Sequence, residues 1–142
     1  MRDFTDAPSP RLCTIVKNAP DEEYGFNLHA ERSRGQFIGA VDPDSAAQRA
    51  GLRSGDRIFV VNGEPISQIS HKEVVSCIKS NPMRCQMLVI DELGARWYFE
   101  NQIPIDMHLP NIVRVCAPPF PSNDEESQHI YTNYTGGDQD QV

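Results

Sequence analysis

The 142-residue sequence lacks several features that would indicate a membrane-spanning or nucleic-acid-binding protein. It has no run of about 18 consecutive apolar residues, the length that a helix needs to cross a bilayer. Its first residues, MRDFTDAPSP, have no apolar run of the kind that signal peptides carry. Its 13 basic residues form no stripe of the sort that neutralises phosphates. We therefore expect a cytoplasmic protein that neither inserts into a membrane directly nor binds nucleic acid.

The sequence is also poor in cysteine and lacks the motifs of common catalytic sites. Its four cysteines, Cys13, Cys77, Cys85 and Cys116, have no CxxC or other metal-like spacing, and a cytoplasmic compartment would keep them reduced. The chain contains no nucleophile elbow, no HExxH and no phosphate-binding loop. We expect no metal, no other cofactor and no enzymatic activity.

Charge and proline content divide the chain into unequal parts. Residues 101–142 hold Arg114 against six acidic residues, whereas the first 100 residues hold 12 basic and 14 acidic ones. We expect a flexible leader over 1–9, a folded domain over 10–92, a packed extension over 93–109 and an acidic, proline-containing, disordered tail over 110–142. The aromatic stretch ARWYF in the extension is compatible with either a short helix or a further strand.

Within 10–92 the pattern predicts six strands and two helices. Apolar and β-branched runs predict strands at 11–17, 25–31, 36–41, 57–61, 64–66 and 84–90. Capping boxes at Ser45 and Ser70 predict helices over 45–51 and 71–80, and Asn81-Pro82 ends the second. These helices are too few and too short to cover both faces of a parallel sheet. The order βββαββαβ therefore predicts a mainly β, α+β fold: a partly open antiparallel sandwich or barrel plugged by two helices.

A glycine between two aromatic residues opens the second predicted strand, in the stretch EYGFNL. Because Gly25 has no Cβ, the successive N–H groups of Tyr24, Gly25 and Phe26 can turn inward together and hold a carboxylate. If this strand is a free sheet edge, an extended peptide can add to it and place its terminal carboxylate in that turn. The helix that begins at His71 would form the other wall of the groove.

An apolar cup for the last side chain of such a peptide should lie beside the carboxylate turn. Residues of the turn, the strand and the helix would line it: Tyr24, Phe26, Leu28, Val75 and Ile78. Taken singly, Phe26 or Ile78 could equally be an ordinary core residue. Together with the glycine turn they indicate a binding pocket.

These elements resemble a PDZ domain. The stretches PRLC, YGFNL, SAAQRAGLRSGDRIFVVNGE and SHKEVVSCI are most similar to the first PDZ module of the sodium-hydrogen exchanger regulatory factor (NHERF) family of scaffolds. The resemblance covers about residues 10–92. It implies a non-catalytic scaffold or adaptor that binds C-terminal tails of membrane transporters, channels or receptors. Through these partners the protein would lie peripherally beneath the plasma membrane.

The resemblance also implies roles for single residues. In this family a histidine matching His71 forms a hydrogen bond with a Ser or Thr hydroxyl two residues before the ligand's end, which implies tails of the form X-Ser/Thr-X-hydrophobic. Lys17, Asn27 and Asp42 are candidates for auxiliary specificity: Lys17 near the carboxylate, and Asp42 against a basic penultimate residue. Glu23 stands where the family commonly has glycine, and it makes the rim of the carboxylate-binding turn more acidic.

Two alternatives stay open. The chain itself ends in Val142, a hydrophobic terminus that such a groove accepts, although Asp140 stands where His71 favours a hydroxyl. Self-binding is therefore possible and not favoured. One alternative is a truncated scaffold whose own tail competes for the groove, with weak self-association through Val142. The other is a regulatory module of a larger enzyme.

Overall fold

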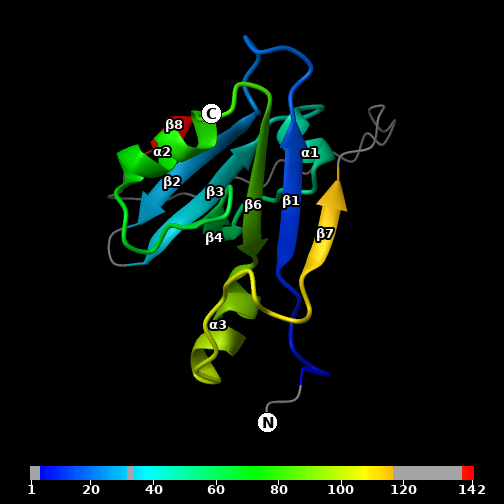
Figure 1. Ribbon diagram of the computed structural model, residues 1–142, viewed down its shortest axis with the longest axis vertical. Coiled ribbons are helices and arrows are strands. Elements are labelled where there is room, and N and C mark those ends of the chain that lie inside the picture. Colours follow the sequence, from blue (N-terminus) through cyan, green and yellow to red (C-terminus); the bar gives the residue numbers. More distant parts are fainter. Residues whose placement is uncertain (1–3, 32–33, 117–138) are drawn as a thin grey trace.

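A computed structural model describes residues 4–31, 34–116 and 139–142. Figure 1 shows a twisted sheet flanked by short helices. In chain order the elements are β1 (Arg11–Val16), β2 (Phe26–Glu31), β3 (Gly35–Val41), α1 (Ala46–Arg49), β4 (Arg57–Val61), β5 (Glu64–Pro65), α2 (His71–Lys79), β6 (Arg84–Ile90), α3 (Glu92–Glu100), β7 (Val113–Cys116) and β8 (Gln139–Gln141). The strands follow the order β7-β1-β6-β4-β3-β2-β8, and β5 pairs with β4.

The predicted order βββαββαβ and the α+β class are confirmed over the segment from β1 to β6. Both capping signals are present: the Ser45 side chain accepts a hydrogen bond from the Gln48 N–H, and Ser70 and Glu73 form a complete capping box at the start of α2. The Asn62-Gly63 turn between β4 and β5 has positive φ at both residues, which is typical of a tight two-residue hairpin turn.

Two strands lie in the part of the sequence expected to be a disordered tail. β7 pairs in parallel with β1, from Arg11↔Val113 to Thr14↔Cys116, so the sheet is mixed and not purely antiparallel. β8 pairs antiparallel with β2. The expectation of disorder from residue 110 onward therefore needs correction for 113–116 and 139–141, while residues 117–138 lie outside the described part.

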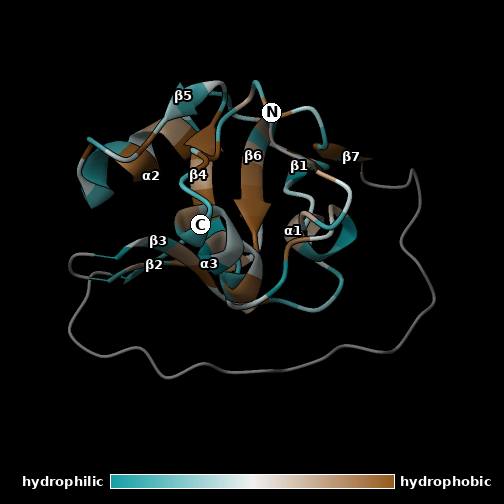
Figure 2. Cartoon of the chain, turned by 90° about the horizontal axis from the view of Figure 1, so that it is seen from below, coloured by the Kyte–Doolittle hydropathy of each residue, from teal (hydrophilic) through white to brown (hydrophobic). Residues whose placement is uncertain are grey.

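The core lies between the sheet and the helices α1 and α2. Its largest cluster joins Val74 and Ile78 of α2 and Ala46 and Ala47 of α1 to inward side chains of the strands. The strands β4 and β6 are hydrophobic along most of their length (Figure 2). In β6, Met87 and Val89 belong to this cluster, while Leu88 and Ile90 belong to two smaller ones, so both faces of the strand are covered, which explains the nearly continuous apolar run at 87–90.

The extension after β6 contains a helix, α3, which packs against the sheet and the N-terminal segment. The Asp91 carboxylate caps it by accepting a hydrogen bond from the Gly94 N–H at 2.7 Å. The Tyr98 ring is fully buried, and its hydroxyl donates to the Pro8 carbonyl at 2.7 Å. The Arg57 guanidinium of β4 lies 4.9 Å from the Phe99 ring centroid. Of the two forms open for ARWYF, the structure has the helix.

A buried ion pair connects β1 to the turn before β4. The Asp56 side chain is only 2% exposed and accepts hydrogen bonds from the Arg11 guanidinium and, at 2.9 Å, from the Arg53 N–H. The Asp56 carbonyl also accepts from the Ile38 N–H at 2.7 Å. This residue therefore joins the first strand, β3 and the turn into β4.

We expect Asp56→Ala to lower the free energy of unfolding by about 3 kcal/mol, because it leaves the largely buried Arg11 charge without its partner. The measurement is urea denaturation followed by circular dichroism. Asp21→Ala, at an exposed acidic residue, serves as the control and should change stability by less than about 0.5 kcal/mol. A loss below about 1 kcal/mol in Asp56→Ala would contradict this role.

Candidate functional site

The C-terminal residues of the chain lie in a groove between β2 and α2. β8 adds to the outer edge of β2 with the register Asn27↔Gln141, Leu28↔Asp140 and His29↔Gln139. In Figure 1, β8 lies beside α2, next to β2. Self-binding, which the sequence did not favour, is thus the arrangement that the structure has.

The terminal carboxylate of Val142 is held by the turn that opens β2. The Gly25 and Phe26 N–H groups donate to a Val142 carboxylate oxygen at 2.8 and 3.3 Å, and the Val142 N–H donates back to the Phe26 carbonyl at 2.9 Å. The third predicted donor, the Tyr24 N–H, forms no hydrogen bond with Val142 in the described residues. Two backbone donors therefore hold this carboxylate.

Gly25 is required here for two separate reasons. Its φ is +99°, which side-chain-bearing residues rarely adopt. A Cβ on Gly25 would also lie 2.2 Å from the Ser45 Cβ, at the N-cap of α1. The Gly25 carbonyl accepts a hydrogen bond from the Asp42 N–H at 2.8 Å, so the turn is also joined to the end of β3. The sequence indicated the backbone conformation, whereas the contact with Ser45 comes from the tertiary fold.

The Val142 side chain is buried, with 3% of its surface exposed. It belongs to one apolar cluster with four predicted pocket residues, and the fifth, Val75, packs against that cluster. The four are Tyr24, Phe26, Leu28 and Ile78. The apolar residues expected from the sequence thus lie in one continuous apolar cluster with Val142.

His71 contacts the residue two positions before the chain end. Its Nε2 lies 2.8 Å from Asp140 Oδ2, and its Nδ1 lies 3.0 Å from Gln36 Oε1. The His71 side chain is 9% exposed, while that of Asp140 is 52% exposed. Gln36, in β3, is a site residue that sequence reasoning missed, although a glutamine at the start of an otherwise apolar strand was a signal available for it.

The predicted auxiliary residues take different places. The Gln141 amide donates to Asp42 Oδ2 at 3.2 Å, so Asp42 contacts the penultimate side chain. Asn27 pairs with Gln141 through the strand register, and its side chain lies against Gly39, where an added Cβ would be 2.9 Å from the Asn27 amide oxygen. The Lys17 ammonium lies 4.6 Å from the centroid of the Tyr24 ring, in a cation–π contact.

A cavity of about 330 Å³ adjoins the Val142 carboxylate. Two cations, Lys17 and Lys79, and two acids, Glu22 and Glu23, are among the residues that line it. Burial raises the pKa of the Tyr24 phenol to about 12, so this lining residue stays protonated and donates to the Asn81 carbonyl at 3.4 Å. Glu23 thus stands on the rim of the carboxylate site, as expected, together with lysines that offset its charge.

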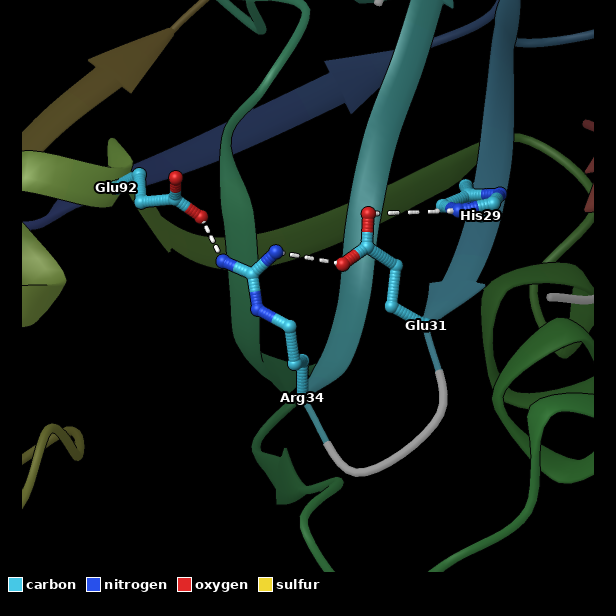
Figure 3. Close-up of polar contacts among 4 residues, drawn as sticks. All are labelled: His29, Glu31, Arg34 and Glu92. Atoms are coloured by element: carbon cyan, nitrogen blue, oxygen red, sulfur yellow. Dashed lines mark hydrogen bonds and ion pairs between the residues drawn. The ribbon is translucent and has the colours of Figure 1, made fainter. Parts of the chain in front are cut away.

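A chain of polar contacts runs from Glu92 at the start of α3 through Arg34 and Glu31 to His29 in β2 (Figure 3). The Arg34 guanidinium contacts Glu92, the first residue of α3, and lies 2.7 Å from Glu31 Oε1. The other Glu31 oxygen lies 3.7 Å from His29 Nε2. His29 is fully buried in β2, and this burial lowers its pKa. The extension helix is therefore electrostatically connected to the strand that binds the tail.

A family model for the PDZ domain matches residues 13–90. The chain belongs to the PDZ-domain family. The matched segment runs from β1 to β6 and thus contains β2, α2 and the turn at Gly25.

Relatives of this PDZ domain include exchange regulatory cofactors. The Na(+)/H(+) exchange regulatory cofactor-like protein nrfl-1 of Caenorhabditis elegans is 59% identical over 111 residues, 78% of this chain and 24% of the relative. Cofactor NHE-RF1 of Gallus gallus is 45% identical over 102 residues, 70% of this chain and 30% of the relative. These relatives confirm the resemblance to the NHERF family, and the chain spans less than a third of their length.

A solved structure also matches: the PDZ domain from choanoflagellate SHANK1 bound to a GIRK3 peptide. The TM-score is 0.50 at 33% sequence identity, and the match covers 58% of this chain and 92% of that one. In the described part of this PDZ protein, no helix is long and apolar enough to cross a membrane. The described residues also contain no group of three or more His, Cys, Asp or Glu side chains placed to hold a metal ion.

We expect Gly25→Ala to destabilise the PDZ domain by about 2 kcal/mol more than Gly63→Ala does, because only the former also forces a side chain into a packed neighbour. Gly63 is the matched control: its φ is +81° and an added Cβ would have no heavy atom within 4 Å. Both variants carry the same kind of backbone strain. Urea denaturation gives the two free energies of unfolding, and equal losses would contradict the proposed importance of the Ser45 contact.

Proposed function

We propose that this protein is a non-catalytic adaptor whose PDZ groove captures C-terminal tails by strand addition to β2. The observation that carries the proposal is the geometry of Val142, whose carboxylate accepts from Gly25 and Phe26 while its side chain is buried beside α2. A tail of another protein with a hydrophobic last residue fits the same positions. A tail of a few residues should bind with a dissociation constant near the micromolar scale, about −8 kcal/mol.

We propose that His71 selects the residue two positions before the ligand's end and favours Ser or Thr in partner tails. Support comes from the contact between its Nε2 and the side chain at this position, Asp140. A hydroxyl at the same place can donate to or accept from the imidazole. Asp42, which contacts Gln141 here, would favour a basic penultimate residue.

The proposed partners are the C-terminal tails of integral membrane transporters, channels or receptors. The names of the relatives, which are exchange regulatory cofactors, support this class, as does the peptide bound to the SHANK1 domain. We place the protein in the cytoplasm, held peripherally beneath the plasma membrane by its partners. A regulatory module of a larger enzyme is less well supported, because the relatives are named as cofactors.

A second candidate function is self-regulation, in which the chain's own tail competes with partner tails. The observation that favours it is β8 itself, which fills the groove from the carboxylate turn to His71. Only residues 117–138 separate β7 from β8 in the sequence, so the tail is present at the groove at an effective concentration of about 1 mM. A tether of this kind makes even a weakly matched tail an effective competitor.

We expect His71→Ala to abolish the preference for Ser or Thr at the third-last position of a C-terminal peptide library. The screen uses the full chain carrying Val142→Asp, so that its own tail does not occupy the groove. The control variant, Lys72→Ala, changes the adjacent, exposed helix residue and should keep the preference. An unchanged preference in the His71 variant would rule out its role in reading the hydroxyl.

We expect Val142→Asp to raise the affinity for an outside peptide by about tenfold, because it removes the tethered competitor. The measurement is fluorescence anisotropy with a labelled peptide ending Asp-Gln-Thr-Arg-Val, compared between the variant and the original chain. Gln139→Asn, at an exposed β8 position, serves as the control and should leave the affinity unchanged. Equal affinities of the original and Val142→Asp chains would exclude self-occupation.

A further inference from the structure

Two cysteines lie on neighbouring elements beside the groove, and the peptide-binding function uses neither of them. Cys77 is half-buried on α2, and Cys85 is fully buried on β6. Cys77 packs against the apolar cluster that contains Cys85. The connection between α2 and β6 covers only residues 80–83, so it keeps the end of the helix near the start of the strand. The two thiols therefore belong to one packed region.

The Asn62 side chain shows how close the two elements come at this point. Its amide nitrogen donates to the Cys77 carbonyl at 2.9 Å, and its amide oxygen accepts from the Gln86 N–H, also at 2.9 Å. A single side-chain amide thus spans the gap between the backbones of α2 and β6, one residue from Cys85. Burial and, secondly, the nearby Cys77 raise the pKa of the Cys85 thiol to about 12.

The other two cysteines are placed where they cannot pair with Cys85 or with each other. In the parallel pairing of β1 with β7, Cys116 lies opposite Thr14, so its side chain and that of Cys13 point to opposite faces of the sheet. In the antiparallel pairing of β1 with β6, Cys13 and Cys85 are diagonal neighbours. Such neighbours are about 7–8 Å apart, farther than the Cα atoms of most disulfides. Cys77 is thus the cysteine placed to pair with Cys85.

We propose that Cys77 and Cys85 are a redox pair, which hydrogen peroxide oxidises to a disulfide that joins α2 to β6 and weakens the binding of tails. The effect on tails rests on the proposed function, whereas formation of the disulfide does not. Cytoplasmic thiols are kept reduced, and the disulfides that form there are usually transient and redox-sensing. The pair therefore acts only while the oxidant is present.

The half-buried thiol reacts first, because Cys85 has no exposed surface. The Cys77 thiolate attacks one oxygen of hydrogen peroxide, the O–O bond breaks, and Cys77 becomes a sulfenic acid while hydroxide leaves and takes up a proton. The Cys85 sulfur then attacks the Cys77 sulfur, the S–O bond breaks, and the hydroxyl leaves as water with the proton of the Cys85 thiol. The two thiols lose two electrons and two protons, and the peroxide is reduced to water.

A bond between these sulfur atoms acts on the pocket for the last side chain of a tail. Ile78, next to Cys77, belongs to the same apolar cluster as Tyr24 and Val142. Cys85 lies near Tyr24, since it contributes to the raised pKa of that phenol. A covalent bond holds two sulfur atoms closer than a packing contact does, and a close-packed core passes such a shift to its neighbours. The disulfide therefore draws α2 toward β6 and narrows the pocket.

Tryptic mapping detects the disulfide directly, because each of the four cysteines falls in a different tryptic peptide. The full chain carrying Val142→Asp is treated with hydrogen peroxide, and the remaining thiols are alkylated. We expect the non-reducing digest to contain residues 73–79 joined to residues 85–96, and dithiothreitol to separate them. Cys77→Ala should not form this species. The control, Cys116→Ala, changes an exposed cysteine of β7 and should form it as readily as the chain with all four cysteines.

The same samples measure the effect on the groove. We expect oxidation to lower the affinity for a labelled peptide ending Asp-Gln-Thr-Arg-Val by at least about threefold, because the pocket for its last side chain is narrowed. Dithiothreitol should restore the affinity. Oxidation of the Cys77→Ala chain should leave its affinity unchanged. Cys77→Ser, which keeps the size of the side chain more closely, is a second variant with the same expected result.

The outcomes separate this inference from the proposed function. Absence of the joined peptides after oxidation, or an unchanged affinity when they form, overturns the inference and leaves the peptide-binding function standing. An equal loss of affinity in the Cys77→Ala chain also overturns it, since the loss then comes from oxidation elsewhere. If the labelled peptide fails to bind the reduced chain, the proposed function fails, and the digest still decides whether the two cysteines pair.

Discussion

The groove depends on one sheet edge, the outer side of β2, to which β8 adds. β2 pairs with β3 on one side, and α2 stands beside its other side, so the space that remains admits a single extended chain. Gly25 closes this space at one end, because its φ of +99° directs two N–H groups into it. The backbone of β2 thus sets the direction and the register of any bound chain before a side chain is read.

Much of the fold and the groove could be predicted from sequence because strong local signals coincide there. The capping box at Ser70 fixes where α2 begins and hence where His71 stands, and Gly25 marks the turn. β7 gave no such signal, since its four residues, largely exposed, pair because β1 offers a free edge. The position of Asp140 opposite His71 was anticipated, but self-binding was not favoured. Matching side chains to a family preference omits the effect of tethering the tail to the same chain.

Different charged or polar groups face each residue of the bound tail along the groove. Lysines and acids share the rim near the last residue, Asp42 faces the penultimate side chain, and His71 faces the one before it. Behind His71, the contacts from His29 through Glu31 and Arg34 reach Glu92 in α3. These contacts connect α3 to β2, the strand that pairs with the bound tail.

The two outermost strands of the sheet, β7 and β8, both come from the last 30 residues of the chain. When β8 leaves, β2 presents an open edge of the kind that pairs with strands of other molecules. The tail and the groove are different surfaces, so insertion of one molecule's terminus into the next is a heterologous contact that builds rings or open filaments. Dilution favours insertion of a tail into the groove of its own chain, and a high concentration of chains favours insertion between chains. One short strand thereby connects the occupancy of the groove to the state of association of the protein.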